Sequence, residues 1–322
     1  MSNKVDVIIP AYNAHKTIGQ TIASIVMQTM IKDIRITIVN DCSDEDYSKF
    51  VEQYKNTINI QEVKLEENAG PGVARQKGIE NTDGEFITFM DADDVLFSTY
   101  AIKNLYDAIN KENYDAVNSI FLEEGKEMQL LDHKCDTVWV FGKMYRRSFI
   151  EENKLHFNES RANEDTGFNK VVFGIGKCGY LSNPTYIWKY NPNSITKVDK
   201  FIYSFTGLEG FIYNMTWAVQ EFYRLHLEDE KLFDVIATNM IIMYFYYIST
   251  LNAKDRRYDV NTYLQWVKKY YDEIYVKEEE NITEDIIKNA WTNVARGQGN
   301  IIIENMPNIT FKEFLELLKN YK

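Results

Sequence analysis

Four short apolar runs in the first ninety residues, separated by stretches with helical spacing, constrain the fold of this chain more than any other feature. The runs are rich in branched and aromatic side chains and cover residues 5–10, 34–40, 58–65 and 86–89. The segments between them predict helices over residues 16–30, 44–54 and 73–80. Strands that alternate with helices in this way favour a mainly parallel sheet with helices on both faces. We therefore predict an α/β fold.

Each predicted strand is followed directly by a side chain that can bind a ligand. Tyr12, Asp41, Asn68 and Asp91 come after the first, second, third and fourth strand. In sheets of this kind ligands bind beyond the carboxyl ends of the strands. The four side chains are therefore expected to gather at one crevice.

The fourth strand ends in three carboxylates within four positions, Asp91, Asp93 and Asp94. Two carboxylates one residue apart supply oxygen ligands of the kind that Mg²⁺ and Mn²⁺ prefer. The same residues also suit the start of a helix, which is predicted near Ser98. The triplet alone leaves both interpretations open.

Composition and charge limit the class of protein. The chain has 322 residues, of which 45% are hydrophobic, enough for one large domain or two modest ones. The net charge of -12 argues against a broad nucleic-acid surface, because phosphate backbones are held chiefly by clustered Lys and Arg. Cys42, Cys135 and Cys178 are few and widely separated, which predicts neither a disulfide framework nor a zinc site.

The sequence predicts a cytoplasmic protein. Its first residues lead straight into a strand without the apolar core of a signal peptide. The most apolar segment, residues 241–248, is too short to span a bilayer. Peripheral contact with a membrane remains compatible with this prediction.

The residues around the four strand ends form a series of motifs. They read Val-Ile-Ile-Pro-Ala-Tyr-Asn at 7–13, Val-Asn-Asp-Cys-Ser-Asp at 39–44, Asn-Ala-Gly-Pro-Gly-Val-Ala-Arg at 68–75 and Asp-Ala-Asp at 91–93. This order resembles the family 2 inverting glycosyltransferases, which have the GT-A fold. The resemblance is clear over the first hundred residues, thins through about residue 200 and is absent beyond. It departs from the family at Asn40, where a further Asp is common.

The resemblance implies a site for a nucleoside diphosphate sugar, with UDP favoured. Tyr12 would stack on the base, Asp41 would accept the base imide N–H, and Arg75 would lie beside the base. Asp93 would ligate a divalent cation, Mn²⁺ or Mg²⁺, that bridges the two phosphates, and Asp91 would bind ribose or assist the metal. The other donor-binding positions implied are Pro10, Ala11, Asn68, Gly70 and Ala92. In isolation Tyr12 would be a core tyrosine and Arg75 a surface arginine.

Later segments add candidates from the same resemblance. Asp165 would be the catalytic base with Glu164 in support, although two carboxylates also suit a first helical turn. Lys143 would face the leaving phosphate, although a lysine is more often solvated. Ser194 and Lys197 would lie over the diphosphate, although the Asn-Pro and Pro-Asn pairs before them also favour a plain turn.

Beyond residue 200 the sequence predicts a bundle of helices. Apolar residues recur at helical spacing from Leu208 to Phe222 and from Val235 to Tyr244. We therefore predict a catalytic domain over 1–200 and a helical region over 201–322. The helical region would serve acceptor binding or homo-oligomerisation.

Taken together, these patterns predict a metal-dependent inverting glycosyltransferase that moves a sugar from a UDP-sugar to a hydroxyl acceptor, a glycan or polymer. The alternative from another class is a non-catalytic scaffold module that binds the nucleotide sugar in a glycan-assembly complex. A nicotinamide-dependent dehydrogenase is excluded, because the first strand leads to Pro10 and Tyr12 and not to a glycine fingerprint.

Overall fold

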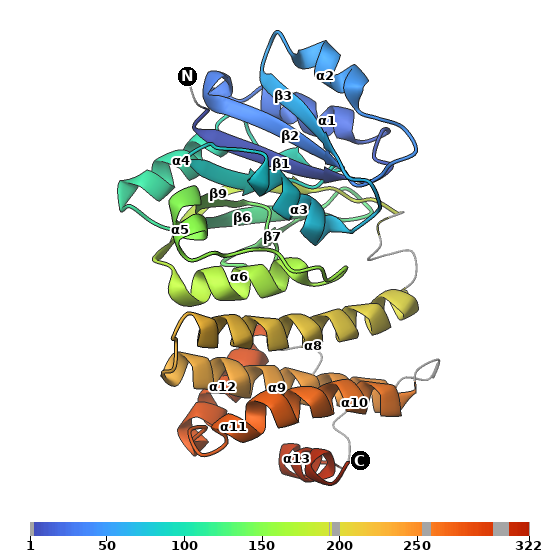
Figure 1. Ribbon diagram of the computed structural model, residues 1–322, viewed down its shortest axis with the longest axis vertical. Coiled ribbons are helices and arrows are strands. Elements are labelled where there is room, and N and C mark those ends of the chain that lie inside the picture. The colour runs from blue at the N-terminus through green and yellow to red at the C-terminus, as the bar shows by residue number, and fades with distance from the viewer. Residues whose placement is uncertain (1–2, 193, 195–199, 253–258, 299–308, 322) are drawn as a thin grey trace. The chain divides into compact units, whose positions relative to one another are not determined.

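The computed structural model describes residues 3–192, 194, 200–252, 259–298 and 309–321. The chain divides into two compact units, Met1–Ser194 and Ile195–Lys322. The first unit contains a sheet with helices on both faces, and the described residues of the second contain helices and no strand (Figure 1).

A single nine-stranded sheet forms the centre of the first unit. Its strands are β1 (Val5–Ala11), β2 (Ile34–Asn40), β3 (Asn59–Lys64), β4 (Phe86–Phe89), β5 (Val95–Leu96), β6 (Ala116–Glu124), β7 (Leu130–His133), β8 (Lys143–Arg146) and β9 (Cys178–Trp188). They lie in the order β3-β2-β1-β4-β8-β6-β9-β5, with β7 paired to β6.

The first four strands are parallel to one another, as the sequence predicts. The second half of the sheet is mixed, because β8 runs antiparallel to both β4 and β6 while β9 runs parallel to β6. The predicted α/β fold is therefore confirmed, with antiparallel pairs that the strand and helix alternation alone did not predict.

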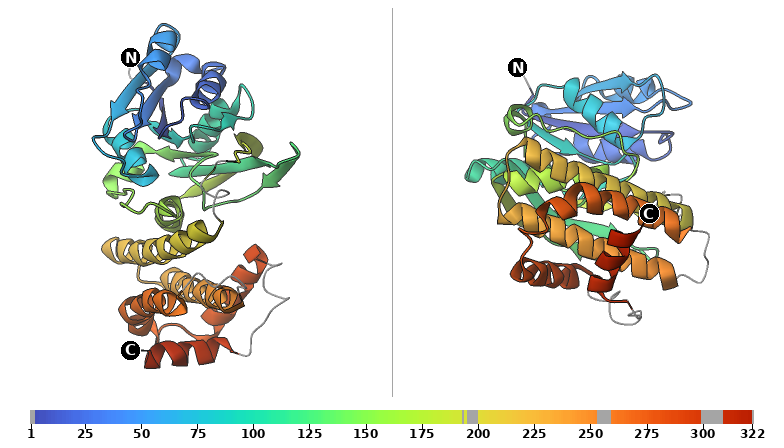
Figure 2. Two further views of the ribbon diagram at one scale, coloured as in Figure 1. Left: turned by 90° about the vertical axis from the view of Figure 1, so that its right-hand side faces the viewer. Right: turned by 60° about the horizontal axis from the view of Figure 1, so that its bottom comes forward.

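Helices cover both faces of this sheet (Figures 1 and 2). They are α1 (Ile18–Val26), the short 3-10 helix η1 (Ile31–Asp33), α2 (Ser48–Tyr54), α3 (Pro71–Glu80), α4 (Ala101–Lys111), α5 (Arg147–Glu152) and α6 (Glu164–Ile175). On one face α1 and α4 bury Ile22 and Leu105 in a cluster with Val7. On the other face α3 lies very close to β1, since a Cβ added at Gly78 would come within 2.3 Å of the Ile8 side chain.

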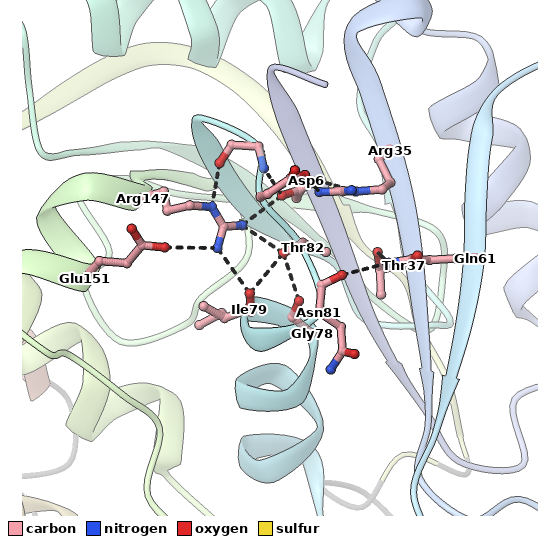
Figure 3. A network of polar contacts seen from close by, with 12 residues as sticks. Asp6, Arg35, Thr37, Gln61, Gly78, Ile79, Asn81, Thr82, Arg147 and Glu151 are labelled. Carbon is pink, nitrogen blue, oxygen red and sulfur yellow. Dashed lines mark hydrogen bonds and ion pairs between the residues drawn. The ribbon is translucent and has the colours of Figure 1, made fainter. Parts of the chain in front are cut away.

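A buried ion-pair network fixes the amino-terminal end of the sheet (Figure 3). The Asp6 carboxylate accepts hydrogen bonds from Arg35 Nε and Arg147 Nη2, both at 2.8 Å, and from the Gly84 N–H at 2.7 Å. Arg147 also donates to the Ile79 carbonyl at 3.1 Å. Because Asp6 is fully buried, the network ties β1, β2, the end of α3 and the start of α5 together.

The second unit is helical, and Figure 2 shows it in yellow to red. Its helices are α8 (Lys200–Arg224), α9 (Glu230–Asn252), α10 (Val260–Tyr270), the π-helix η2 (Tyr271–Tyr275), α11 (Val276–Glu278), α12 (Glu284–Gln298) and α13 (Phe311–Asn320). The two predicted amphipathic helices are α8 and α9, which bury Phe222 and Met240. By length and composition the segment Glu230–Ile248 of α9 could cross a membrane, but 61% of its most apolar window is buried inside the protein, as in a core helix.

Candidate active site

The loops after β1, β2 and β3 are hydrogen-bonded to one another at the carboxyl edge of the sheet. The Asp41 N–H donates to the Ala11 carbonyl at 2.9 Å, and the Asn68 side-chain amide donates to the Asp41 carbonyl at 3.2 Å. Arg161 holds the third loop from its other side by donating to Asn68 Oδ1 at 2.8 Å. The strand ends therefore meet at one edge, as the sequence predicts.

The Asp41 carboxylate shapes the loop that leads into α3. Its two oxygens accept hydrogen bonds from the N–H groups of Ala69, at 2.7 Å, and Gly70, at 2.9 Å. Gly70 has a φ of 91°, which favours glycine, and Pro71 follows at the first position of the helix. Asp41 thus has a structural role that its position after a strand did not reveal. Each of its oxygens keeps a second lone pair for a ligand.

Tyr12 projects from the end of β1 with 56% of its surface exposed, which excludes a core tyrosine. The next residue, Asn13, is held in a left-handed conformation by its N–H, which donates to Ser43 Oγ at 2.9 Å. Asn40, where the family often has an aspartate, is buried and bonds Glu62 through its side-chain amide at 2.8 Å. The exposed ring of Tyr12 therefore lies on a loop that is held in place by hydrogen bonds, while Asn40 has a structural role.

Arg75 is buried on α3 and links two carboxylates from distant parts of the chain. Its Nη1 donates to Glu164 Oε1 at 2.5 Å and its Nη2 to Asp91 Oδ1 at 3.0 Å. Its guanidinium also lies 6.0 Å from the centre of the Phe157 ring. Burial disfavours the charged form, but Asp91, Glu164 and Asp165 together raise the pKa of Arg75 above its usual value. Arg75 is thus a buried cation and not a surface arginine.

The first turn of α6 carries Glu164 and Asp165, both buried, next to the start of α3. A Cβ added at Gly72 would lie 2.9 Å from Glu164 Cγ, so only glycine allows the two helices to approach this closely. Asn163 precedes the turn in the left-handed region, with a φ of 61°. Folding thus places two carboxylates beside Arg75, although Glu164 lies 89 residues after it in the sequence.

Asp165 differs from its neighbour in that no cation among the described residues is bonded to it. Its Oδ1 accepts the N–H of Thr166 at 2.7 Å, and within the described residues its Oδ2 has no hydrogen-bond partner. Burial, followed by repulsion from Glu164, raises the pKa of Asp165 to about 7, against the attraction of Arg75. This carboxyl group can therefore take up or release a proton near neutral pH.

The three carboxylates after β4 separate into two roles. Asp94 is fully buried and accepts hydrogen bonds from the Tyr186 hydroxyl and the Lys189 N–H, both at 2.7 Å, so it anchors the end of β9. Asp91 and Asp93 remain partly exposed, and Asp93 Oδ2 accepts the Asn191 side-chain amide at 2.8 Å. Burial, with repulsion from Asp91, raises the pKa of Asp93.

The chemistry of this pair fits a hard divalent cation. Asp91 Oδ2 and Asp93 Oδ1 have no protein hydrogen bond in the described part of the chain, and both residues are partly open to solvent. No group of three or more His, Cys, Asp or Glu residues among those described is arranged to hold a metal. The pair can therefore contribute two oxygen ligands, and phosphate oxygens and water would have to complete the set.

The remaining predicted residues lie in different surroundings. Ala92 is buried beside the acidic pair, and Ser194 donates its N–H to the Asn191 carbonyl at 3.1 Å. Lys143 is fully buried on β8, with Nζ 3.7 Å from Asp136 Oδ1. Lys197 lies outside the described residues. The roles of these residues in donor binding stay predictions.

Comparison with known proteins identifies this arrangement. Residues 6–162 match the family model described as Glycosyl transferase family 2. This segment is a family 2 glycosyltransferase domain. The chain is 28% identical over 202 residues to poly(ribitol-phosphate) beta-N-acetylglucosaminyltransferase TarS of Staphylococcus aureus, and 31% identical over 190 residues to poly(ribitol-phosphate) beta-glucosyltransferase of Bacillus spizizenii. These matches cover 58% and 53% of this chain, but only 35% and 29% of the two relatives.

A solved structure extends the likeness over nearly the whole chain. The crystal structure of S. aureus TarS 1-349 in complex with UDP-GlcNAc matches with a TM-score of 0.71 and covers 96% of this chain and 97% of that one. The sequence identity is 19%, so this likeness shows the fold. The predicted GT-A fold with a helical C-terminal region is confirmed.

Proposed function

We propose that this protein transfers a sugar from a nucleoside diphosphate sugar, specifically a UDP-sugar, to a hydroxyl acceptor with inversion at the anomeric carbon. The observation that carries the proposal is Asp165, a buried carboxyl group with a raised pKa of about 7 and a free oxygen, next to the acids at the carboxyl edge of the sheet. A general base works best when its pKa is near the operating pH.

The donor would lie across the loops after β1 to β4. The exposed ring of Tyr12 offers a stacking surface for the base, and the spare lone pairs of Asp41 can accept its imide N–H. Arg75, which the family resemblance places beside the base, holds Asp91 and Glu164 at the edge of this site. Pro10, Ala11, Asn68, Gly70 and Ala92 shape its walls.

Asp93 and Asp91 are the residues that would hold a divalent cation, Mg²⁺ or Mn²⁺. When bound, the cation supplies positive charge that stabilises the diphosphate as a leaving group. The raised pKa of Asp93, caused by burial and by repulsion from Asp91, supports this assignment, because it reflects negative charge that the protein itself leaves uncompensated.

In the transfer step Asp165 accepts the proton of the acceptor hydroxyl. The hydroxyl oxygen forms a bond to the anomeric carbon from one face of the sugar. The bond from that carbon to the diphosphate oxygen breaks on the other face, and its electron pair leaves with the diphosphate. Glu164 supports the base by keeping Arg75 in place. A positioned base contributes roughly 10²–10⁴-fold to such a step.

We propose a cell-surface polymer as the acceptor, with poly(ribitol phosphate) as the first candidate, because two relatives are named for transfer to that polymer. The test is incubation of the protein with poly(ribitol phosphate), Mn²⁺ and either UDP-GlcNAc or UDP-glucose, followed by analysis of sugar bound to the polymer. A β-linked sugar on the polymer supports the proposal. Binding of UDP without transfer to any polyol, glycan or lipid-linked acceptor supports the non-catalytic scaffold instead.

The second unit is proposed to bind the acceptor or to pair subunits. A truncated protein ending at residue 194 tests this role, because loss of transfer with retained UDP binding would assign acceptor contacts to the second unit.

A cytoplasmic location remains our prediction, and peripheral contact with a membrane is compatible with it. The three cysteines are free thiols.

A further inference from the structure

Among the candidate residues that the structure describes, Lys143 is a lysine buried inside the sheet domain. It is fully buried on β8, and its Nζ has no hydrogen-bond partner among the described residues. The nearest acid, Asp136, lies 3.7 Å away, but Asp136 Oδ1 already accepts the N–H groups of Val138 and Trp139. A buried ammonium group without a hydrogen bond is costly unless opposite charges compensate it, and Asp136 forms an ion pair with this one.

The register of the sheet shows which face Lys143 occupies. Lys143 and Tyr145 are two residues apart on β8, so their side chains point to the same face. Tyr145 packs on α6, where its ring lies 5.6 Å from that of Phe168 and its hydroxyl donates to Asn169 at 2.8 Å. Lys143 therefore faces α6, whose first turn, one turn before Phe168, carries Asp165.

Arg75 and Lys143 are the two cations that act on Asp165, and Arg75 is already bonded to two other carboxylates. The groups that interact electrostatically with Asp165 are Glu164 on its own helix, Arg75 on α3, Asp91 after β4, and Lys143 and Tyr145 on β8. Arg75 donates to Glu164 and Asp91 and makes no hydrogen bond to Asp165. Burial lowers the pKa of Lys143 to about 8, and attraction to Asp136 and Asp165 opposes this, so the two carboxylates act on the same ammonium group.

We propose that Lys143 is a positioning residue for the base: its buried ammonium group compensates the carboxylate of Asp165 and keeps it ionised, ready to accept the acceptor proton. This inference rests on the proposed role of Asp165. It replaces the contact between Lys143 and the leaving phosphate that the family resemblance implies.

The test is the pH dependence of transfer from UDP-GlcNAc to poly(ribitol phosphate) by Lys143→Met, which keeps length and removes charge. Loss of a neighbouring cation should move the acid limb of kcat/KM upward by about 1 pH unit. Transfer should then fall about tenfold at pH 6 and approach the wild-type rate at pH 9, with unchanged UDP affinity. Lys103→Met, at an exposed lysine of α4, is the matched control and should leave the profile unchanged.

Other outcomes overturn the inference. A loss of the same size at every pH with weaker UDP binding would place Lys143 on the donor phosphate. Lys143→Gln repeats the test if the Met variant folds poorly. The melting temperature, relative to wild type, should fall between pH 5.5 and 7.5 in either variant, because the protonated form of Asp165 becomes more favoured in the folded state, and because Lys143 itself, with a pKa of about 8, stays mostly charged in this range. A pH-independent difference would mean that Lys143 only packs.

The stability measurement also separates this inference from the proposed function. If the wild-type protein transfers no sugar to any acceptor, the proposed function fails. The pH-dependent shift in melting temperature would still report whether Lys143 compensates Asp165, since it requires no substrate.

Discussion

Replacement of Asp165 by Asn should abolish transfer and, at the same time, stabilise the ligand-free protein above pH 7. The activity loss follows because Asn cannot accept the acceptor proton, and we expect a decrease of roughly 10²–10⁴-fold. The gain in stability follows from burial, which disfavours the ionised carboxylate that Asn removes.

The magnitude follows from the pKa of Asp165, which rises from 3.8 to about 7 on folding. A group with a raised pKa in the folded state contributes stability below its unfolded pKa, and this contribution is lost as pH rises through the folded pKa. About three pH units at about 1.4 kcal/mol each give a cost of about 4 kcal/mol above pH 7. The Asn variant avoids this cost, so its advantage should grow between about pH 4 and pH 7.

Glu164→Gln is the matched control on the neighbouring residue. Glu164 accepts a hydrogen bond from the buried Arg75, so loss of its charge should destabilise the protein, by about 2 kcal/mol. Urea unfolding of both variants at pH 5 and pH 8, without divalent cations, measures these opposite effects, and calorimetry with UDP checks that binding persists. Near-normal transfer by Asp165→Asn, or lower stability than wild type at pH 8, would refute the reasoning.

Three further predictions concern other parts of the site and the scaffold. Asp93→Ala should remove the dependence of UDP affinity on Mn²⁺ in calorimetry; an unchanged dependence would exclude it as a ligand. Tyr12→Ala should weaken UDP binding about tenfold through lost stacking, with an unchanged melting temperature because the ring is exposed; normal affinity would exclude the stacking role. Asp6→Ala should cost about 3–5 kcal/mol in urea unfolding by leaving Arg35 and Arg147 without their buried partner; a cost below 1 kcal/mol would contradict this.

The sequence predicts the first half of the fold well, because the strands from β1 to β4 are apolar runs separated by helices of ordinary length. β6, over Ala116–Glu124, and the short β8, over Lys143–Arg146, lie beyond this alternation. β5 has two residues, and β7 carries exposed leucines, so neither has a periodic signal. The insertion of β8 between β4 and β6 depends on tertiary packing that no local pattern reports.

The sequence was enough to predict which residues make up the candidate site, but not the contacts between them. Motif order pointed to Asp91 and Arg75, yet the bond from Arg75 to Glu164 joins segments 89 residues apart. The role of Asp94 in holding Tyr186 was hidden in the acidic triplet, because the three carboxylates look alike in sequence. Burial and hydrogen bonding separate them only after the chain has folded.

The two ends of the sheet show how charge balance distinguishes scaffold from candidate site. At the amino-terminal end one carboxylate, Asp6, is bonded by two arginines. At the carboxyl end Arg75 and Lys143 face a larger number of acids, and burial with mutual repulsion raises the pKa of Asp93 and Asp165. Uncompensated buried charge destabilises a protein unless a ligand relieves it.

Binding should therefore stabilise this end of the sheet in a pH-dependent way. UDP with Mn²⁺ is expected to raise the melting temperature more at pH 8 than at pH 5, because burial raises the pKa of Asp93, so that its carboxyl group is ionised to a greater extent and attracts a cation more strongly at the higher pH. The measurement is thermal unfolding with and without UDP and Mn²⁺ at both pH values. Asp93→Ala, which lacks one of the two acids, should show a smaller difference between them. An equal shift at pH 5 and pH 8 in the wild-type protein would mean that the acids at this edge do not take part in binding.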